Sequence, residues 1–294
     1  MQKILEHSSQ RTRIIYLFLF SLMGSFVASG ILFMAGTSLP SFENSIWYYR
    51  LSIVLQDIFV VFLPAYTICR WITDNPLKMI GLKKSGKLPQ GLFYGLLIFL
   101  ISYPAIAVIG RWNEQIVLPD SLKVIEDWMR QMEDAAKQVT DLFLSGETIP
   151  DLFLNLLIIA AAAAFVEEVF FRGVLQQFIE KWLHNGHAAV WIGAFIFSAI
   201  HLQFYGFIPR LIMGAVLGYL FLYSRNLWIP ILYHFVNNAA VVVITYFWDE
   251  NNFLKQLEDK PLTWMSLVVM TASGLLTYFL FLRYKELFKK DDSN

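Results

Sequence analysis

Two runs of the chain, residues 14–34 and 263–282, contain no charged side chain. Each is long enough to cross a bilayer, because a transmembrane helix needs about 20 mostly apolar residues at a rise of about 1.5 Å per residue. The whole chain is 57% apolar and only 16% charged, whereas about a quarter of the residues of a soluble domain are charged. These features predict an integral membrane protein.

Charge and cysteine content exclude two other classes of protein. The chain has 23 basic and 23 acidic side chains, so its formal net charge is zero. No basic excess is present to neutralise phosphates, which argues against nucleic-acid binding. Cys69 is the single cysteine of the sequence, and it therefore cannot belong to an internal disulfide framework.

Eight apolar segments are candidates for membrane helices, and they predict an all-α, polytopic membrane helical bundle of about eight transmembrane helices. The segments are 14–34, 51–72, 91–109, 152–171, 188–201, 207–223, 227–247 and 263–282. The first follows a basic start like that of a signal peptide. Its apolar run is too long for a signal-peptide core, and we interpret it as a retained anchor.

We divide the chain into four parts. Residues 1–110 hold the N-terminal transmembrane helices, 111–150 a polar connector, 151–250 a helical core and 251–294 the last transmembrane helix with a charged tail. Apolar side chains recur at helical spacing in the connector and predict an amphipathic helix that is either a solvated connector against the bundle or a lid. They are Leu122, Ile125, Met129, Met132, Val139 and Phe143.

The distribution of Lys and Arg predicts the orientation in the membrane. Basic residues concentrate in both tails and in the loop 70–87, and fewer occur in the short loops on the other side. Cytoplasmic loops carry the excess of Lys and Arg, so we expect both termini in the cytoplasm. The short loops favour a bacterial plasma membrane.

Charged groups at membrane depth are costly and need a reason to be there. Asp57 stands alone in the second segment, where we expect it to snorkel or to pair locally. Glu167, Glu168 and Arg172 stand in the sequence AAAAFVEEVFFRGVL, directly after a run of small residues. Glu168 and Arg172 are four residues apart and share a helix face, so they can neutralise each other. Glu167 points elsewhere and is left without a local partner, so its carboxylate remains available to act as a general base.

Two histidines and an asparagine complete the polar set of the core. His201 ends one apolar segment, and His234 precedes Asn238 by one helical turn in another. A lone histidine on an apolar helix is more often a packing residue than a ligand, but two strong polar groups on one face indicate a site or a hydrogen-bond network. If residues 184–186 form a sharp turn, Glu167 and His201 lie level to within roughly 3 Å in a helical hairpin.

These residues give the sequence its resemblance to a known family. Glu167-Glu168-x-x-x-Arg172, Phe197-x-x-x-His201 and His234-x-x-x-Asn238 occur in this order, each on a predicted membrane helix. The set resembles the CAAX protease and bacteriocin-processing family, the intramembrane group that includes the Ras-converting CAAX endopeptidase. The resemblance covers roughly residues 152–247, and the first 150 residues carry no pattern of the family.

The resemblance implies an endopeptidase that acts at the membrane. Glu167 and His201 would activate the attacking water, and His234 and Asn238 would stabilise the oxyanion. Arg172 would hold Glu168 and so fix the helix face that presents Glu167. These roles suit the side chains, because a carboxylate can take the proton of water and N–H groups can donate to developing negative charge.

Several alternatives stay open at this level. We expect no cofactor, but Glu167, His201 and His234 have the composition of a His₂Glu zinc site. A non-catalytic immunity or scaffold protein of the same fold is the main alternative function, and a proton-relaying transporter is a weaker one. The expected partners are membrane lipid and a peptide or protein substrate, with or without an attached lipid.

Overall fold

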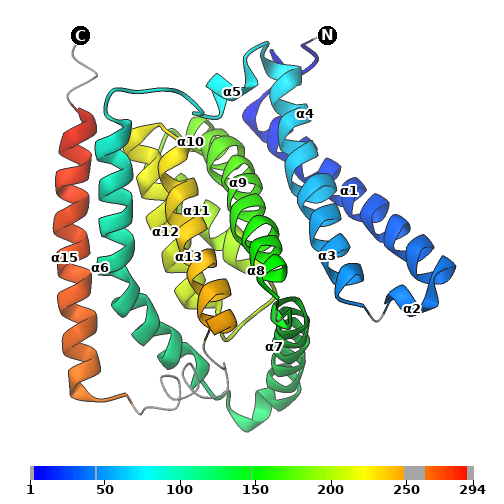
Figure 1. Cartoon of the computed structure of the whole chain (residues 1–294). Coiled ribbons are helices and arrows are strands. Elements are labelled where there is room, and N and C mark those ends of the chain that lie inside the picture. The colour runs from blue at the N-terminus through cyan, green and yellow to red at the C-terminus, as the bar shows by residue number, and fades with distance from the viewer. Residues whose placement is uncertain (1–2, 44, 147, 248–261, 290–294) are drawn as a thin grey trace.

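The computed structural model describes residues 3–43, 45–146, 148–247 and 262–289, and every regular element in these ranges is a helix (Figure 1). Seven helical segments are long and apolar enough to cross a membrane. They are α1 (Gln10–Ser38), α3–η1–α4 (Ile46–Ile72), α6 (Leu88–Glu114), α8–η3–α9–η4–α10 (Ile149–Leu183), α12 (Phe207–Ser224), α13 (Trp228–Phe247) and α15 (Trp264–Lys289). The predicted fold class is confirmed: the chain is an all-helical integral membrane protein.

The expected count of about eight is also close. The eighth candidate is the shorter apolar helix α11 (Gly186–Ala199), which packs beside α12. Four further short or polar helices connect the spans, namely α2 (Pro40–Glu43), α5 (Pro76–Met79), η2 (Asp120–Leu122) and α7 (Lys123–Leu144). The first and last parts of the described chain lie at the same end of the bundle (Figure 1).

Two of the spans are interrupted by π-helical turns. The second consists of α3 (Ile46–Leu55), η1 (Gln56–Phe62) and α4 (Leu63–Ile72), and η1 is π-helical. The fourth consists of α8 (Ile149–Asn155), η3 (Leu156–Ala162), α9 (Ala163–Glu168), η4 (Val169–Gln176) and α10 (Gln177–Leu183), of which η3 and η4 are π-helical. Such wide turns leave backbone groups free and occur frequently at functional sites.

The fourth span ends at the turn expected from the sequence. It continues past Arg172 to Leu183, and His184 then takes the left-handed conformation at φ 53°. Asn185 caps α11 by accepting a hydrogen bond from the backbone N–H of Ala188 (3.0 Å). This cap satisfies one of the free N–H groups at the start of the helix.

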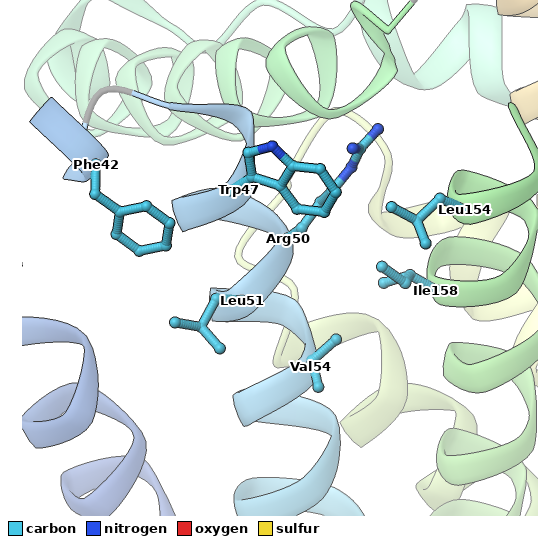
Figure 2. Close-up of a pocket in the computed structure, with 7 residues that line it drawn as sticks. All are labelled: Phe42, Trp47, Arg50, Leu51, Val54, Leu154 and Ile158. Carbon is cyan, nitrogen blue, oxygen red and sulfur yellow. The ribbon is translucent and has the colours of Figure 1, made fainter. Parts of the chain in front are cut away.

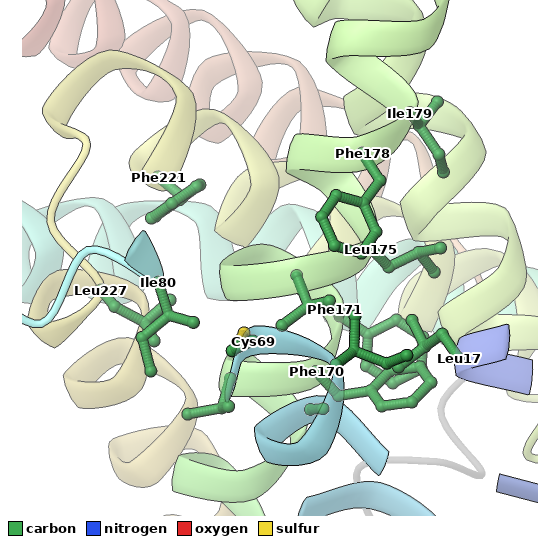
Figure 3. Packing of buried hydrophobic residues seen from close by; sticks show 14 of the residues in the cluster. Leu17, Cys69, Ile80, Phe170, Phe171, Leu175, Phe178, Ile179, Phe221 and Leu227 are labelled. Carbon is green, nitrogen blue, oxygen red and sulfur yellow. The ribbon is translucent and has the colours of Figure 1, made fainter. Parts of the chain in front are cut away.

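The first two spans pack closely on each other and contact the fourth span near both of their ends. Gly24 of α1 lies against η1, and a Cβ atom there would stand 1.8 Å from the carbonyl oxygen of Phe59. Buried side chains of α1 and α4, including Leu17 and Cys69, pack against Phe170, Phe178 and their neighbours on η4 and α10 (Figure 3). This apolar cluster is the main contact between the N-terminal helices and the fourth span.

On the other side of the core, α6 packs between α13 and α15. Pro104 interrupts α6, and Ser273 of α15 bridges the opened turn. Its hydroxyl donates to the carbonyl of Ile101 and accepts from the N–H of Ala105 (3.2 Å). A neighbouring helix thus satisfies backbone groups that would otherwise be unpaired in hydrocarbon.

The predicted amphipathic helix of the connector is present as α7, but its apolar stripe is only partly covered. Phe143 at its end is buried against residues of α3 and α8. Leu122, Ile125 and Val139 are exposed on the described protein. The stripe therefore does not rest on the bundle along its length, and exposed apolar side chains of this kind suit the membrane interface.

Candidate active site

The polar residues of the core come from three spans. Glu167 and Glu168 end α9, with Arg172 one turn further on in η4. His201 follows the end of α11, and His234 and Asn238 lie one turn apart on α13. Because α13 packs against α9, the structure brings the second histidine to the two glutamates.

Glu168 is the centre of a sealed hydrogen-bond cluster. Its Oε1 accepts from Arg172 Nη1 (2.8 Å) and from His234 Nδ1 (2.9 Å). Arg172 Nη2 also donates to the carbonyl of Gly214 on α12 (3.0 Å). The side chains of Glu168 and Arg172 are 0% and 2% exposed. The expected ion pair of Glu168 and Arg172 is present, and it also bonds to α12 and to His234.

Glu167 differs from its neighbour in access and in partners. Its side chain is 21% exposed, and its Oε2 lies 3.8 Å from His234 Nε2. His234 thus stands between the two carboxylates, with Nδ1 on the sealed one and Nε2 towards the accessible one. Glu167 is thus accessible at the surface of the described protein, whereas Glu168 is not.

His201 lies beside this cluster without bonding to it. Its Nδ1 is 2.7 Å from the carbonyl oxygen of Phe197, so Nδ1 carries the proton and Nε2 is left as an acceptor. The ring of Phe197 makes edge contacts with both imidazoles, at centroid distances of 5.0 Å to His201 and 5.9 Å to His234. The two histidines therefore flank one aromatic ring.

Asn238 is held by the π-helical turn of the fourth span. Its Nδ2 donates to the carbonyl of Ile159 in η3 (3.1 Å), and its Oδ1 accepts from Asn237 (3.2 Å). An amide nitrogen has two hydrogens, so one N–H of Asn238 remains for another acceptor. Asn237 thus orients the side chain of its neighbour.

Comparison with known proteins agrees with the motifs. Residues 149–240 match the family model of the type II CAAX prenyl endopeptidase Rce1-like proteins. The matched segment contains all three motifs, and the resemblance inferred from them is confirmed over this part of the chain. The match supports a membrane protease-type function.

A relative is found in Bacillus subtilis (strain 168). The uncharacterized protein YpbD is 34% identical over 101 residues, which are 33% of this chain and 46% of the relative. The chain thus matches less than half the length of that protein. No solved structure matches the chain.

Two charged residues near the site were not assigned to it from the sequence. Asp57 in η1 was expected to snorkel or to pair locally, but its Oδ2 is buried without a hydrogen-bond partner and its charge interacts with that of Glu167. Arg210 in the first turn of α12 also interacts electrostatically with Glu167 and with His201. Only the packing of η1 and α12 against the fourth span reveals these neighbours.

The residues of the alternative zinc site are not assembled as a ready ligand group. Among the described residues, no three His, Cys, Asp or Glu side chains are grouped so that they could hold a metal ion. His234 and His201 each use Nδ1 in a hydrogen bond, to Glu168 and to the carbonyl of Phe197, which leaves Nε2 of both rings open, as in zinc-bound histidines. Zinc lies about 2.0–2.2 Å from nitrogen and oxygen ligands, so Glu167, His201 and His234 would have to move closer together to bind it.

An apolar pocket lies between α3 and the start of the fourth span (Figure 2). Its volume is about 420 Å³, and its walls are apolar except for Arg50. The lining residues are Phe42, Trp47, Arg50, Leu51, Val54, Leu154 and Ile158. Ile158 lies nine residues before Glu167, about 13 Å along a helix at a rise of about 1.5 Å per residue, so the pocket and the accessible glutamate lie on the same span at different heights.

Proposed function

We propose that the protein is an intramembrane endopeptidase of the CAAX-protease type, in which an activated water hydrolyses the peptide bond. The observation that carries this proposal is the contrast between two adjacent carboxylates. Glu168 is sealed and neutralised by Arg172, whereas Glu167 is accessible and faces His234. The family match over residues 149–240 supports a protease-type reaction at the accessible glutamate.

Glu167 and His201 would activate the water. Glu167 has a free carboxylate oxygen, and His201 presents an unprotonated Nε2 because its Nδ1–H is held by Phe197. Both groups can accept a hydrogen bond from one water molecule. Glu167 takes a proton as the water oxygen attacks the peptide carbonyl carbon, in the manner of a general base.

His234 and Asn238 would stabilise the tetrahedral oxyanion. Asn238 retains one N–H, and a protonated His234 between two carboxylates would offer its Nε2–H. When the C–N bond breaks, Glu167 returns the proton to the departing amine, which leaves a carboxylate and an amine as products. Donors of this kind act strongly where water is scarce.

The apolar pocket supports a substrate that remains in the membrane. A lipid attached to a peptide, or an apolar part of the peptide itself, could occupy the volume of about 420 Å³ while the scissile bond reaches Glu167. We therefore propose a peptide or protein substrate, with or without a lipid, and membrane lipid as the surrounding partner.

Peptide cleavage by the full chain in liposomes tests the proposal. Synthetic peptides of randomised sequence, with and without a farnesyl group, are incubated with the protein, and new termini are identified by mass spectrometry. Glu167→Gln should abolish cleavage while the protein still inserts and folds. Glu286→Gln is the matched control, because this glutamate is 67% exposed near the C-terminus of α15.

The outcome also separates the enzyme from the scaffold alternative. Cleavage by Glu167→Gln at the original rate would remove the catalytic assignment. Unchanged cellular function in that variant, with no peptide cleaved by the original chain, would favour a non-catalytic immunity or scaffold protein.

A further inference from the structure

Arg210 lies beside the candidate site, and its guanidinium is fixed by hydrogen bonds that serve no role assigned so far. Its Nη1 and Nη2 donate to the backbone and side-chain oxygens of Gln203. The guanidinium lies against Gly206, where a Cβ atom would stand 3.1 Å from Nη2. The side chain is half-buried, so its position is determined by the protein and it is still reachable.

The register of two neighbouring helices places Arg210 level with the glutamates. Arg172 donates to the carbonyl of Gly214, and Gln176, one turn later, donates to the carbonyl of Gly218. The fourth span and α12 therefore run parallel here, turn beside turn. One turn before Arg172 and Gly214 stand Glu168 and Arg210, and the charges of Arg210 and Glu167 interact.

Arg210 differs from the other deeply placed arginines in its partners. Arg50 is paired with Asp151 at 2.8 Å and Arg172 with Glu168 at 2.8 Å. In the described part of the chain, no carboxylate lies within ion-pair distance of Arg210, and Glu133 and Glu167 interact with it only at longer range. Guanidinium has five N–H donors, and Gln203 uses two of them.

We propose that Arg210 binds a carboxylate of the peptide substrate and so selects which peptides place their scissile bond at Glu167. This inference rests on the proposed function. The planar fork of arginine matches a carboxylate in two parallel hydrogen bonds. The carboxylate belongs either to the C-terminus of the peptide or to an Asp or Glu side chain near the cleaved bond.

Pairs of peptides that differ in one carboxylate test the proposal. In one pair the C-terminus is a free acid or a carboxamide, and in the other an internal Asp is exchanged for Asn. The original chain should prefer the acid form in one of the pairs by about tenfold or more in kcat/KM, since a hydrogen bond to a charged group contributes enough for this ratio. The pair that shows the preference identifies the source of the carboxylate.

Variants at Arg210 should change the preference itself. Arg210→Gln should lower the ratio to about one, and Arg210→Lys should keep part of it because the charge remains without the fork. Lys123→Gln is the control: this cation of α7 is 61% exposed and pairs with Asp127, away from Arg210. It should leave the ratio unchanged. An unchanged ratio in Arg210→Gln, or no preference in the original chain, overturns the proposal.

Binding of the same peptides to the Glu167→Gln variant separates this inference from the proposed function. A preference for the acid form that depends on Arg210, with no cleavage by the original chain, would overturn the endopeptidase and retain the carboxylate site. Cleavage that depends on Glu167, with equal affinity for the acid and the neutral form, would retain the endopeptidase and overturn the carboxylate site. Arg210→Lys also covers the case in which Arg210→Gln does not fold.

Discussion

Replacing Glu168 by Ala should destabilise the protein more than any other change in the site. The carboxylate is fully buried and accepts bonds from Arg172 (2.8 Å) and His234 (2.9 Å). Without it, the guanidinium of Arg172 keeps the carbonyl of Gly214 as its one hydrogen-bond partner, with the ring of Phe197 at 4.8 Å. Removing one member of a buried ion pair costs about 3–5 kcal/mol, because a charge is left unpaired.

A double-mutant cycle tests this reasoning. Unfolding is followed in mixed micelles of a mild detergent and SDS for Glu168→Ala, Arg172→Met and the double variant. The double variant should recover most of the lost stability, since no lone charge remains, although it should not cleave peptides. Glu167→Ala serves as comparison and should cost less, because its side chain is 21% exposed and no arginine lies within ion-pair distance of it. Equal losses for the two glutamates, or additive losses in the cycle, would refute the argument.

Three further outcomes are expected. Gly24→Ala should separate α1 from η1 and destabilise the protein by about 1–3 kcal/mol in the same unfolding assay, since its Cβ would meet the carbonyl of Phe59 at 1.8 Å; Gly30→Ala, with nothing within 4 Å, should have little effect. Peptide cleavage should survive dialysis against a strong chelator, and loss of activity that zinc restores would reinstate the His₂Glu site. Lys84→Cys should be labelled by a membrane-impermeant thiol reagent only from the cytoplasmic side and Asp127→Cys only from the other; the opposite pattern would contradict cytoplasmic termini.

Most of the fold could be predicted from local sequence patterns. Long apolar runs such as 14–34 can only be satisfied in hydrocarbon as helices, and all eight candidate segments are helical in the structure. The turn at His184 and the helix α7 were also predicted, because caps and amphipathic spacing are local features. The exposure of Ile125 on α7 was not, since periodicity shows that a face is apolar but not what covers it.

The residues of the candidate site could be predicted from the sequence, but the contacts between them could not. Spacing alone paired Glu168 with Arg172 and left Glu167 apart, and the structure agrees. Spacing could not show that His234 bonds to Glu168, because the two residues are 66 positions apart. The catalytic roles of these residues stay predictions until the cleavage experiments are done.

The sequence by itself determined that this chain is a helical membrane protein with an Rce1-like segment. It also determined which polar residues lie at membrane depth, because hydropathy and motif spacing are properties of the chain. Only the tertiary structure decided which of two adjacent glutamates is accessible, that Asp57 and Arg210 approach Glu167, and that an apolar pocket lies between α3 and the start of the fourth span. Water access and the neighbours of a charge depend on how separate helices pack, and packing contacts join residues far apart in the sequence.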